Sequence, residues 1–180
     1  MPDNISLRDA TIDDAPAIAA IYNHYVRESL ATLAEDAMPD TPMQQRVQTL
    51  RAAKLPFLVA VDQMQIGIAG YAYASPYSDR SGYAPTLECS IYLHPDHCSK
   101  GIGRQLMDPL ISALVSTTTK TQVLAKMSIL PDQSPESLPT CRLHASMGFR
   151  KVGRLDRVGF KLGKWVDVVM FQLDLEALRK

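Results

Sequence analysis

The stretch "HPDHCSKGIGRQL", residues 94–106, gathers the densest set of side chains in the chain that could do chemistry. His94, His97 and Cys98 are all metal-ligand types. A structural zinc site needs four ligands, however, and they usually come as two separated pairs. The chain offers no second cluster, because its other histidines stand alone in the sequence. We therefore expect no metal, and we interpret the triplet as part of a polar loop.

The same stretch contains two glycines, Gly101 and Gly103. Leu106 occupies the place of the third glycine of a G-x-G-x-x-G dinucleotide loop, and no Walker sequence occurs in the chain. What remains is a strand, a short turn and a helix that begins inside the turn. Main-chain amides at a helix N-terminus carry partial positive charge and bind phosphate oxygens. The loop is therefore either a diphosphate site, with Lys100 and Arg104 adding positive charge, or an ordinary strand-to-helix turn.

A strand is predicted directly before this loop, at 86–93, "TLECSIYL", where polar and apolar residues alternate. Glu88, Ser90 and Tyr92 lie on its polar face. The apolar face consists of Leu87, Cys89, Ile91 and Leu93. A helix from about 103 to 115 follows the loop. The strand therefore carries one carboxylate, Glu88, on the face that is free to meet a ligand.

The rest of the pattern predicts strands and helices in mixed order. A short strand precedes Thr11, and Thr11 with Asp14 forms the pattern of a capping box that starts a helix. Another helix begins near Thr41. Further strands are predicted at 57–61, 66–74, 121–129, 149–160 and 165–175, and a short helix at 140–148. The order β-α-α-β-β-β-α-β-α-β-β indicates an α/β (α+β) fold on one largely antiparallel sheet.

Composition narrows the classes of function. The chain has 180 residues, 46% of them hydrophobic, which predicts a single domain over 1–180. Nineteen basic residues balance nineteen acidic ones, so we expect no nucleic-acid partner. No run of eighteen apolar residues and no signal-peptide layout occur, so we expect no membrane span. Three irregularly spaced cysteines argue against a disulfide framework and favour a reducing cytoplasm.

Several segments together resemble one known family. They are "IYNHY" (21–25), "YASPYSDRSGYAPTLECSIYLHPDH" (73–97), "RLHASMGF" (142–149) and "GFKLGKWVDVVMFQLDL" (159–175). The chain is similar in these segments to the GNAT superfamily of N-acetyltransferases, and in particular to its phosphinothricin acetyltransferase-like branch. The superfamily loop Gln/Arg-x-x-Gly-x-Gly/Ala corresponds to residues 98–103. Cys98 departs from that pattern at the first position.

The resemblance implies the GNAT fold and acetyl-CoA as co-substrate. That fold is a mixed, mostly antiparallel twisted sheet of about six or seven strands flanked by helices, in which strand 86–93 splays from strand 121–129. Pantetheine would add to the open strand edge at Ile91 and Leu93. The loop that would hold the diphosphate consists of Cys98, Ser99, Lys100, Gly101, Ile102, Gly103 and Arg104.

The resemblance also implies catalytic roles. Glu88 matches the glutamate of the branch's Thr-x-Glu and is the expected general base for the acceptor amine. An ordinary glutamate is a poor base at neutral pH, so partial burial or a water relay would be needed. An amide near Leu93 would donate to the thioester oxygen. His144 stands where many relatives carry a tyrosine and would donate a proton to the thiolate or hold the sulfur. A lone helical histidine can equally be structural.

The acceptor is expected to be a small amine, namely an amino acid or an amino-acid-like toxin such as phosphinothricin, methionine sulfone or methionine sulfoximine. Arg80 would bind its anionic end by a two-pronged hydrogen bond, and Tyr83 and Tyr92 would line the pocket. The resemblance further implies a homodimer built around the C-terminal hairpin. No histidine neighbours Cys89 in sequence, so direct attack in a ternary complex is expected rather than an acyl-enzyme.

Two departures from the branch concern the acceptor. Ser78 stands where the branch has a lysine and Leu33 where it has a phenylalanine. A third departure concerns the binding of the cofactor. The segment "PDQSPESLPT" (131–140) replaces the branch's Pro-Asn-x-x-Ser loop, in which the asparagine contacts CoA. Gln133 or Ser137 would substitute for that asparagine. Two rival hypotheses therefore stay open. One is a protein or polyamine acetyltransferase, and the other a non-catalytic acyl-CoA-binding module.

Overall fold

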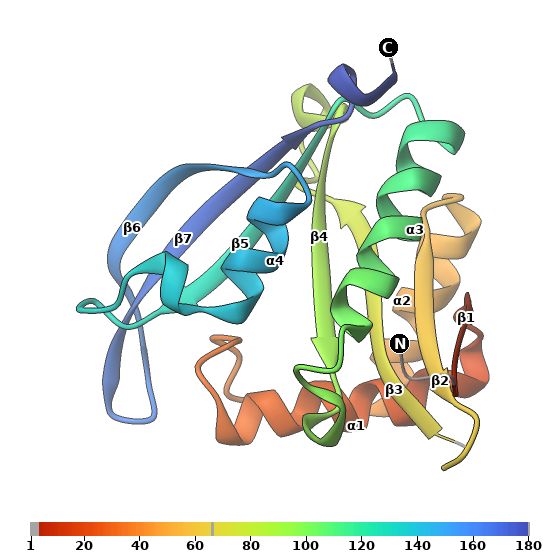
Figure 1. The fold of residues 1–180 in the computed structure, drawn as a ribbon, viewed down its shortest axis with the longest axis horizontal. Coiled ribbons are helices and arrows are strands. Elements are labelled where there is room, and N and C mark those ends of the chain that lie inside the picture. Colours follow the sequence, from red (N-terminus) through yellow and green to blue (C-terminus); the bar gives the residue numbers. More distant parts are fainter. Residues whose placement is uncertain (1–3, 66, 180) are drawn as a thin grey trace.

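A seven-stranded sheet in the order β1-β2-β3-β4-β5-β7-β6 forms the centre of the computed structural model (Figure 1). The structure describes residues 4–65 and 67–179, so Ile66 of the predicted strand 66–74 lies outside it. Neighbouring strands are antiparallel except for the parallel pair β4 and β5. The strands are β1 Ile5–Asp9, β2 Phe57–Asp62, β3 Gly67–Pro76, β4 Thr86–Leu93, β5 Gln122–Ile129, β6 Arg150–Lys161 and β7 Lys164–Asp174. The predicted element order and the mostly antiparallel sheet are confirmed.

Four helices cover the two faces of the sheet. They are α1 Ala15–Glu28, α2 Asp40–Ala52, α3 Ile102–Thr117 and α4 Pro139–Ser146. In Figure 1, α3 and α4 lie in front of the sheet and α2 lies behind it. The face that carries Tyr92 of β4 packs on α1, where the Tyr92 ring centroid lies 5.4 Å from that of Tyr22. The opposite face of β4 carries Cys89, which contacts His144 of α4. The two faces of β4 therefore meet different helices, α1 on one side and α4 on the other.

The capping box predicted at Thr11 and Asp14 is present, although the turn it caps is a 3₁₀ turn, Ile12–Asp14, that leads into α1. The buried Asp14 carboxylate also accepts two hydrogen bonds from Arg8, at 2.6 and 2.7 Å. This bonding to Arg8 holds the pKa of Asp14 below its ordinary value. The start of α1 is therefore fixed to β1 by a charged, hydrogen-bonded contact.

Strand β4 separates from strand β5 after only three residue pairs. Thr86, Leu87 and Glu88 face Gln122, Val123 and Leu124, and the pairing ends there. Beyond this point β5 continues beside β7 through Ile129. Figure 1 shows the two strands diverging, with α4 in front of β5. The separation of strands 86–93 and 121–129 that the resemblance implied is therefore present.

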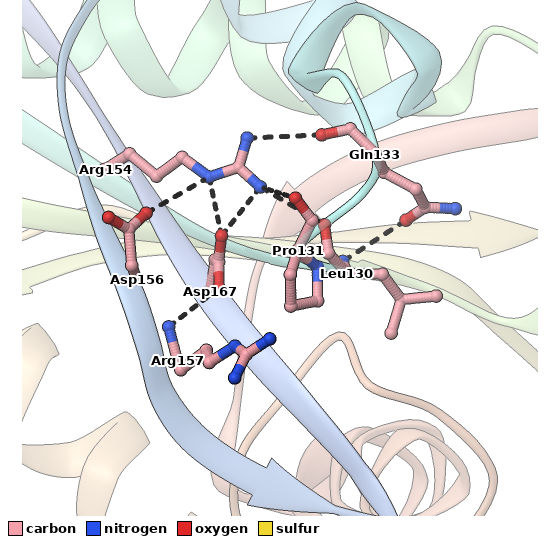
Figure 2. A network of polar contacts seen from close by, with 7 residues as sticks. All are labelled: Leu130, Pro131, Gln133, Arg154, Asp156, Arg157 and Asp167. Carbon is pink, nitrogen blue, oxygen red and sulfur yellow. Dashed lines mark hydrogen bonds and ion pairs between the residues drawn. The ribbon is translucent and has the colours of Figure 1, made fainter.

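An ion-pair network ties the β6–β7 hairpin to the loop after β5 (Figure 2). Arg154 Nε lies 2.7 Å from Asp167 Oδ2, and the same guanidinium donates to main-chain oxygens of the loop. These oxygens belong to Leu130, Pro131 and Gln133. Asp167 also accepts from the amide of Arg157, which lowers the pKa of the carboxyl group. The aspartate of the Gly-x-Lys-x-Gly-x-Trp-x-Asp motif therefore anchors a loop.

Pro109 lies inside α3, where a kink is expected because proline removes one hydrogen bond. The helix nevertheless continues without a break from Ile102 to Thr117. Its inward side is buried at Leu106, Met107 and Leu110. Packing of this side on the sheet maintains the helix across the missing hydrogen bond.

Candidate active site

The open edge of β4 is the first component of the site. From Cys89 to Leu93 this edge has no strand partner in 4–65 or 67–179. An unpaired edge presents main-chain donors and acceptors to an extended ligand. Ile91 and Leu93, the residues predicted to carry pantetheine, lie in this stretch and are half-buried. Their part of the strand is therefore placed as the prediction requires.

The loop between β4 and α3 provides main-chain donors. Gly101 has φ +82°, a left-handed conformation that favours glycine, and it is the N-cap residue of α3. The amides of Arg104 and Gln105 both donate to the Gly101 oxygen, at 3.2 and 3.3 Å. The amides of Ile102 and Gly103 belong to the first turn and so lack an intrahelical partner. Not every main-chain amide of residues 98–104 is therefore free to bind a ligand, because the Arg104 amide already donates to the Gly101 oxygen.

Gly103 has a packing role between α3, α4 and β4. A Cβ atom at this position would lie 3.0 Å from Leu143 Cδ2 of α4 and 3.7 Å from Ile91 Cδ1. Glycine therefore lets α3 approach α4 and β4 closely. The Arg104 guanidinium donates to Ser146 Oγ at 2.7 Å, while Lys100 is exposed. Arg104 thus holds the end of α4, and any role of these two cations toward phosphate stays a prediction.

Tyr25 of α1, part of the segment 21–25 that resembles the family, makes a polar contact at the site. Its hydroxyl donates to the main-chain oxygen of Leu93 at 2.7 Å. Cys98 Sγ lies 3.8 Å from the same hydroxyl. Burial raises the pKa of Tyr25, so the hydroxyl keeps its proton. Tyr25 thereby fixes the end of β4, where the oxyanion donor is expected.

The predicted base, Glu88, lies at the point where β4 and β5 separate. Its side chain is one-quarter exposed, and Oε2 lies 2.8 Å from Lys126 Nζ. Lys126 was not among the residues predicted for the site. The alternation of side chains in 121–129 places Lys126 on the same face of the strand as Leu124. Lys126 lies close to Glu88 because Leu124 pairs with Glu88 across the two strands, and the sequence does not specify this register. The site therefore contains an ion pair where a single carboxylate was expected.

Tyrosines form two groups around β4, and one of these groups contacts the ion pair through Lys126. Tyr92 is largely buried, with its ring centroid 5.3 Å from that of Tyr25, and burial raises its pKa. Tyr83 is exposed and packs edge-on against Tyr77, with 5.3 Å between the ring centroids. The Tyr77 centroid lies 5.7 Å from Lys126 Nζ. Of the two tyrosines predicted to line the acceptor pocket, Tyr83 is joined to the ion pair through Tyr77 and Lys126. Tyr92 packs instead among the tyrosines of α1 and β3, and its pocket role stays a prediction.

Arg80 lies in the exposed loop between β3 and β4. Its amide donates to Ser78 Oγ at 3.3 Å, and within 4–65 and 67–179 its guanidinium forms no ion pair. No contact in the structure joins it to Glu88, so its role toward an anionic acceptor stays a prediction. A second arginine, Arg46 of α2, lies 5.7 Å above the Tyr73 ring, away from the ion pair.

The loop after α1 is held against the end of β6. Lys161 is buried, and its ammonium group donates to three main-chain oxygens at 2.7 to 3.2 Å. These oxygens belong to Tyr25, Ser29 and Thr32. Leu33 packs over Gly159, where an added Cβ would lie 2.6 Å from Leu33 Cδ1. The Gly and Lys of the hairpin motif therefore position the loop that carries Leu33.

His144 is buried beside Cys89. Its Nδ1 lies 2.8 Å from the Thr140 oxygen, a contact that requires a proton on Nδ1. Its Nε2 then accepts from Cys89 Sγ, 3.9 Å away. Burial lowers the pKa of His144. The neutral ring therefore has no N–H left to direct at a thiolate, and the predicted proton donation would have to pass through the Cys89 thiol.

The contact of Cys89 with His144 raises the question of a covalent route that the sequence had disfavoured. Burial, together with the charge of Glu88, raises the pKa of the Cys89 thiol to about 12. A cysteine nucleophile acts as the thiolate and needs a lowered pKa. The Cys89–His144 pair is therefore a packed structural contact, and direct attack remains the expected route.

Replacing Cys89 with serine should leave kcat nearly unchanged, because the thiol stays protonated at neutral pH. Loss of a covalent nucleophile, in contrast, lowers kcat by about 10⁶-fold. Intact-protein mass spectrometry after incubation with acetyl-CoA alone is the matching measurement, with no acetylated enzyme expected. A stable acetyl-enzyme that disappears in the Cys89→Ser variant would contradict direct attack.

The histidines of the stretch 94–106 do not form a metal cluster with Cys98 in the part of the chain that the structure describes. His97 Nε2 lies 3.6 Å from Asp62 Oδ2, so His97 is part of a buried pair with Asp62. In 4–65 and 67–179 no group of three or more histidine, cysteine, aspartate or glutamate side chains is placed to hold a metal ion. Over the same residues, no helix has the length and apolar character needed to cross a bilayer.

Comparison with known proteins was made for sequence and for structure. The family model described as "Acetyltransferase (GNAT) domain" matches residues 7–170. A phosphinothricin N-acetyltransferase of Alcaligenes faecalis is 39% identical over 165 residues, covering 92% of this chain and 80% of the relative. An L-methionine sulfoximine/L-methionine sulfone acetyltransferase of Salmonella typhimurium is 31% identical over 173 residues, covering 96% and 95%.

Among solved structures, a GNAT superfamily phosphinothricin acetyltransferase of Sinorhizobium meliloti in complex with acetyl-CoA superposes with a TM-score of 0.85. It is 31% identical, and the match covers 95% of this chain and 88% of that one. The similarity thus spans the whole sheet, including the separated strands and the loop before α3.

Proposed function

The chain belongs to the GNAT family of N-acetyltransferases, and we propose that it acetylates the α-amino group of a small amino acid or amino-acid-like toxin. It is an acetyl-CoA-dependent N-acetyltransferase. The observation that carries the proposal is the position of Glu88, a carboxylate on the polar face of β4 where β4 and β5 separate. The relatives that are phosphinothricin and methionine sulfoximine/sulfone acetyltransferases support the acceptor class.

The residues present fit acetyl-CoA. The left-handed Gly101 opens α3, and the first free amides of that helix suit a diphosphate. The unpaired edge of β4 at Ile91 and Leu93 suits the amides of pantetheine. Gln133 and Ser137, the possible substitutes for the missing asparagine, both form hydrogen bonds inside their own loop. We propose that main-chain groups therefore supply most of the cofactor contacts.

When bound, acetyl-CoA supplies an acetyl group activated as a thioester. Glu88, directly or through water, takes the proton from the acceptor nitrogen, so that an N–H bond breaks as an O–H bond forms. The amide near Leu93 donates to the thioester oxygen as negative charge develops there. The C–N bond to the acceptor forms as the C–S bond of the thioester breaks, and CoA leaves as a thiolate that takes up a proton from the solvent. Tyr25 keeps this end of β4 in place through its hydrogen bond to the Leu93 oxygen.

The direct test is release of free CoA from acetyl-CoA across a panel of acceptors. The panel holds phosphinothricin, methionine sulfone, methionine sulfoximine, the common amino acids, a polyamine and peptides with free N-termini. We expect release with one or more amino-acid acceptors and an acetyl group on the α-nitrogen of the product. Turnover with only the peptides or the polyamine would favour the rival enzyme class. Acetyl-CoA binding without any turnover would favour the acyl-CoA-binding module.

A homodimer through the C-terminal hairpin is part of the proposal. Large apolar side chains are exposed along β6 and the β6–β7 turn, and Phe160 packs edge-on against Trp165 there, 5.2 Å between centroids. They are Leu155, Val158, Phe160, Leu162 and Trp165, each 43–56% exposed. Large apolar side chains exposed together in one hairpin are typical of a subunit interface. Their concentration in the β6–β7 hairpin supports the homodimer that the resemblance implied.

Trp165→Glu should convert the dimer to a monomer at micromolar concentration, because it places a charge among these exposed apolar side chains. Size-exclusion chromatography with light scattering measures the mass directly. Met64→Glu is the control, since Met64 is 79% exposed on another part of the surface and should leave the dimer intact. A monomeric wild-type chain at these concentrations would end the proposal.

We also propose that the protein works in the cytoplasm. Cys89, Cys98 and Cys141 all carry free thiols, two of them buried. Free thiols of this kind persist in a reducing compartment.

A further inference from the structure

We infer that Lys126 receives the carboxylate of the acceptor and so selects free amino acids over other amines. This inference rests on the proposed function, because it assigns the acceptor's second charged group to a residue of the same site. Lys126 lies on β5 two residues beyond Leu124, which pairs with Glu88, so both charges stand where the strands separate. Lys126 Nζ lies 2.8 Å from Glu88 Oε2, so the two side chains form a direct ion pair.

The charges of the pair complement those of an α-amino acid. In such an acceptor the amino nitrogen and the carboxylate carbon are separated by two bonds, or about 2.5 Å. An acceptor that places its ammonium on Glu88 therefore brings its carboxylate within reach of Lys126. The ion pair is then replaced by two new ones, and no charge is left without a partner. Only after this exchange does Glu88 take the proton that leaves the acceptor nitrogen.

Lys126 has the freedom that the exchange requires. Its side chain is 42% exposed, and a lysine ammonium is a point charge on a flexible stem. The Tyr77 ring, whose centroid lies 5.7 Å from Nζ, offers it a second favourable position by a cation–π contact. The ammonium can thus leave Glu88 without losing all of its favourable contacts.

Other cations near the acceptor side are placed differently. Arg80 is exposed in the loop after β3 and has no contact with Glu88. Arg46 lies with Nη1 3.4 Å from the Tyr73 hydroxyl, over the tyrosines of β3. Lys161 is buried against main-chain oxygens. Among residues 4–65 and 67–179, Lys126 is the cation that forms an ion pair with Glu88, so it lies within reach of a carboxylate whose amino group meets that base.

A carboxylate site at Lys126 would favour some acceptor amines over others. The α-amine of a peptide N-terminus has an amide beside it in place of a carboxylate. Such an amine would displace Lys126 from Glu88 and offer it no charge in return. The exchange is therefore favourable for a free amino acid and unfavourable for a peptide or protein N-terminus, a carboxamide or a polyamine.

The test compares kcat/KM for the best amino acid of the panel with kcat/KM for its carboxamide, in the wild type and in Lys126→Met and Lys126→Arg. Because charge-assisted hydrogen bonds are lost, Lys126→Met should lower kcat/KM for the acid by about 10- to 100-fold, while the carboxamide, which no longer has to displace Lys126, should show no loss. Lys126→Arg should restore most of the preference for the acid. Lys151→Met, at an exposed position of β6, is the control and should behave as wild type.

The results with these variants distinguish a wrong assignment of Lys126 from a wrong acceptor class, on which that assignment rests. If Lys126→Met reduces acid and carboxamide equally, Lys126 acts only by holding Glu88, and the inference is overturned. If instead Arg80→Gln removes the preference for the acid while Lys126→Met keeps it, the carboxylate site is at Arg80. If no amino acid is acetylated by the wild type, the proposed function itself fails, whatever the variants do.

Discussion

Glu88→Gln should lower kcat by about 100- to 10,000-fold, the usual contribution of a positioned general base. Glutamine keeps the size and the hydrogen-bonding shape of the side chain but cannot take a proton from the acceptor nitrogen. Steady-state release of CoA at saturating acetyl-CoA and acceptor measures the change. The affinity for acetyl-CoA should stay as in the wild type, because the cofactor contacts lie on the strand edge and in the loop before α3.

Glu176→Gln is the matched control for this experiment. Glu176 is exposed near the C-terminal turn and touches neither β4 nor β5, so its variant should turn over as the wild type does. Calorimetric titration with acetyl-CoA shows whether the Glu88 variant still binds. Full turnover by Glu88→Gln would remove Glu88 as the base and leave acceptor binding as its role.

Gly101→Val should weaken acetyl-CoA binding by about 100-fold or more, the loss of two charge-assisted hydrogen bonds at about 1.5 kcal/mol each. A β-branched residue does not adopt φ +82° without strain. The turn must then change, and the first amides of α3 no longer point together at the diphosphate. The KM for acetyl-CoA and the calorimetric Kd report this loss directly.

Backbone strain alone has to be separated from loss of the diphosphate site. Gly163 has φ +72° in the β6–β7 turn, and a Cβ there, as at Gly101, would meet nothing within 4 Å. Gly163→Val therefore imposes similar strain far from the cofactor loop. It should lower Tm to a similar extent and leave the Kd for acetyl-CoA unchanged. Equal affinity of the two variants would show that residues 98–103 do not hold the diphosphate.

The fold was predictable from the sequence because its elements are marked by local patterns. Alternation in 86–93 marked β4, and the capping residues Thr11 and Asp14 marked the start of α1. Boundaries shifted by one or two residues, since helix ends depend on caps such as the left-handed Gly101. Pro109 lies inside α3, and the helix continues across it because its inward side is packed in the core.

The site was less predictable, since its contacts depend on register and on packing between distant elements. The pairing of Glu88 with Leu124 decides that Lys126 meets the base, and no local pattern specifies that register. The same holds for the hydroxyl of Tyr25 on the Leu93 oxygen and for His144 beside Cys89. The close approach of Gly103 to Leu143 likewise depends on how α3 packs on α4, which no local pattern specifies.

A crystal structure of the protein with CoA and the best acceptor of the panel tests the central claim most directly. We predict the diphosphate at the main-chain amides before and within the first turn of α3, and the pantetheine along β4 at Ile91 and Leu93. The acceptor nitrogen should face Glu88, with its carboxylate at Lys126. CoA bound anywhere else, or an acceptor nitrogen far from Glu88, would contradict the account.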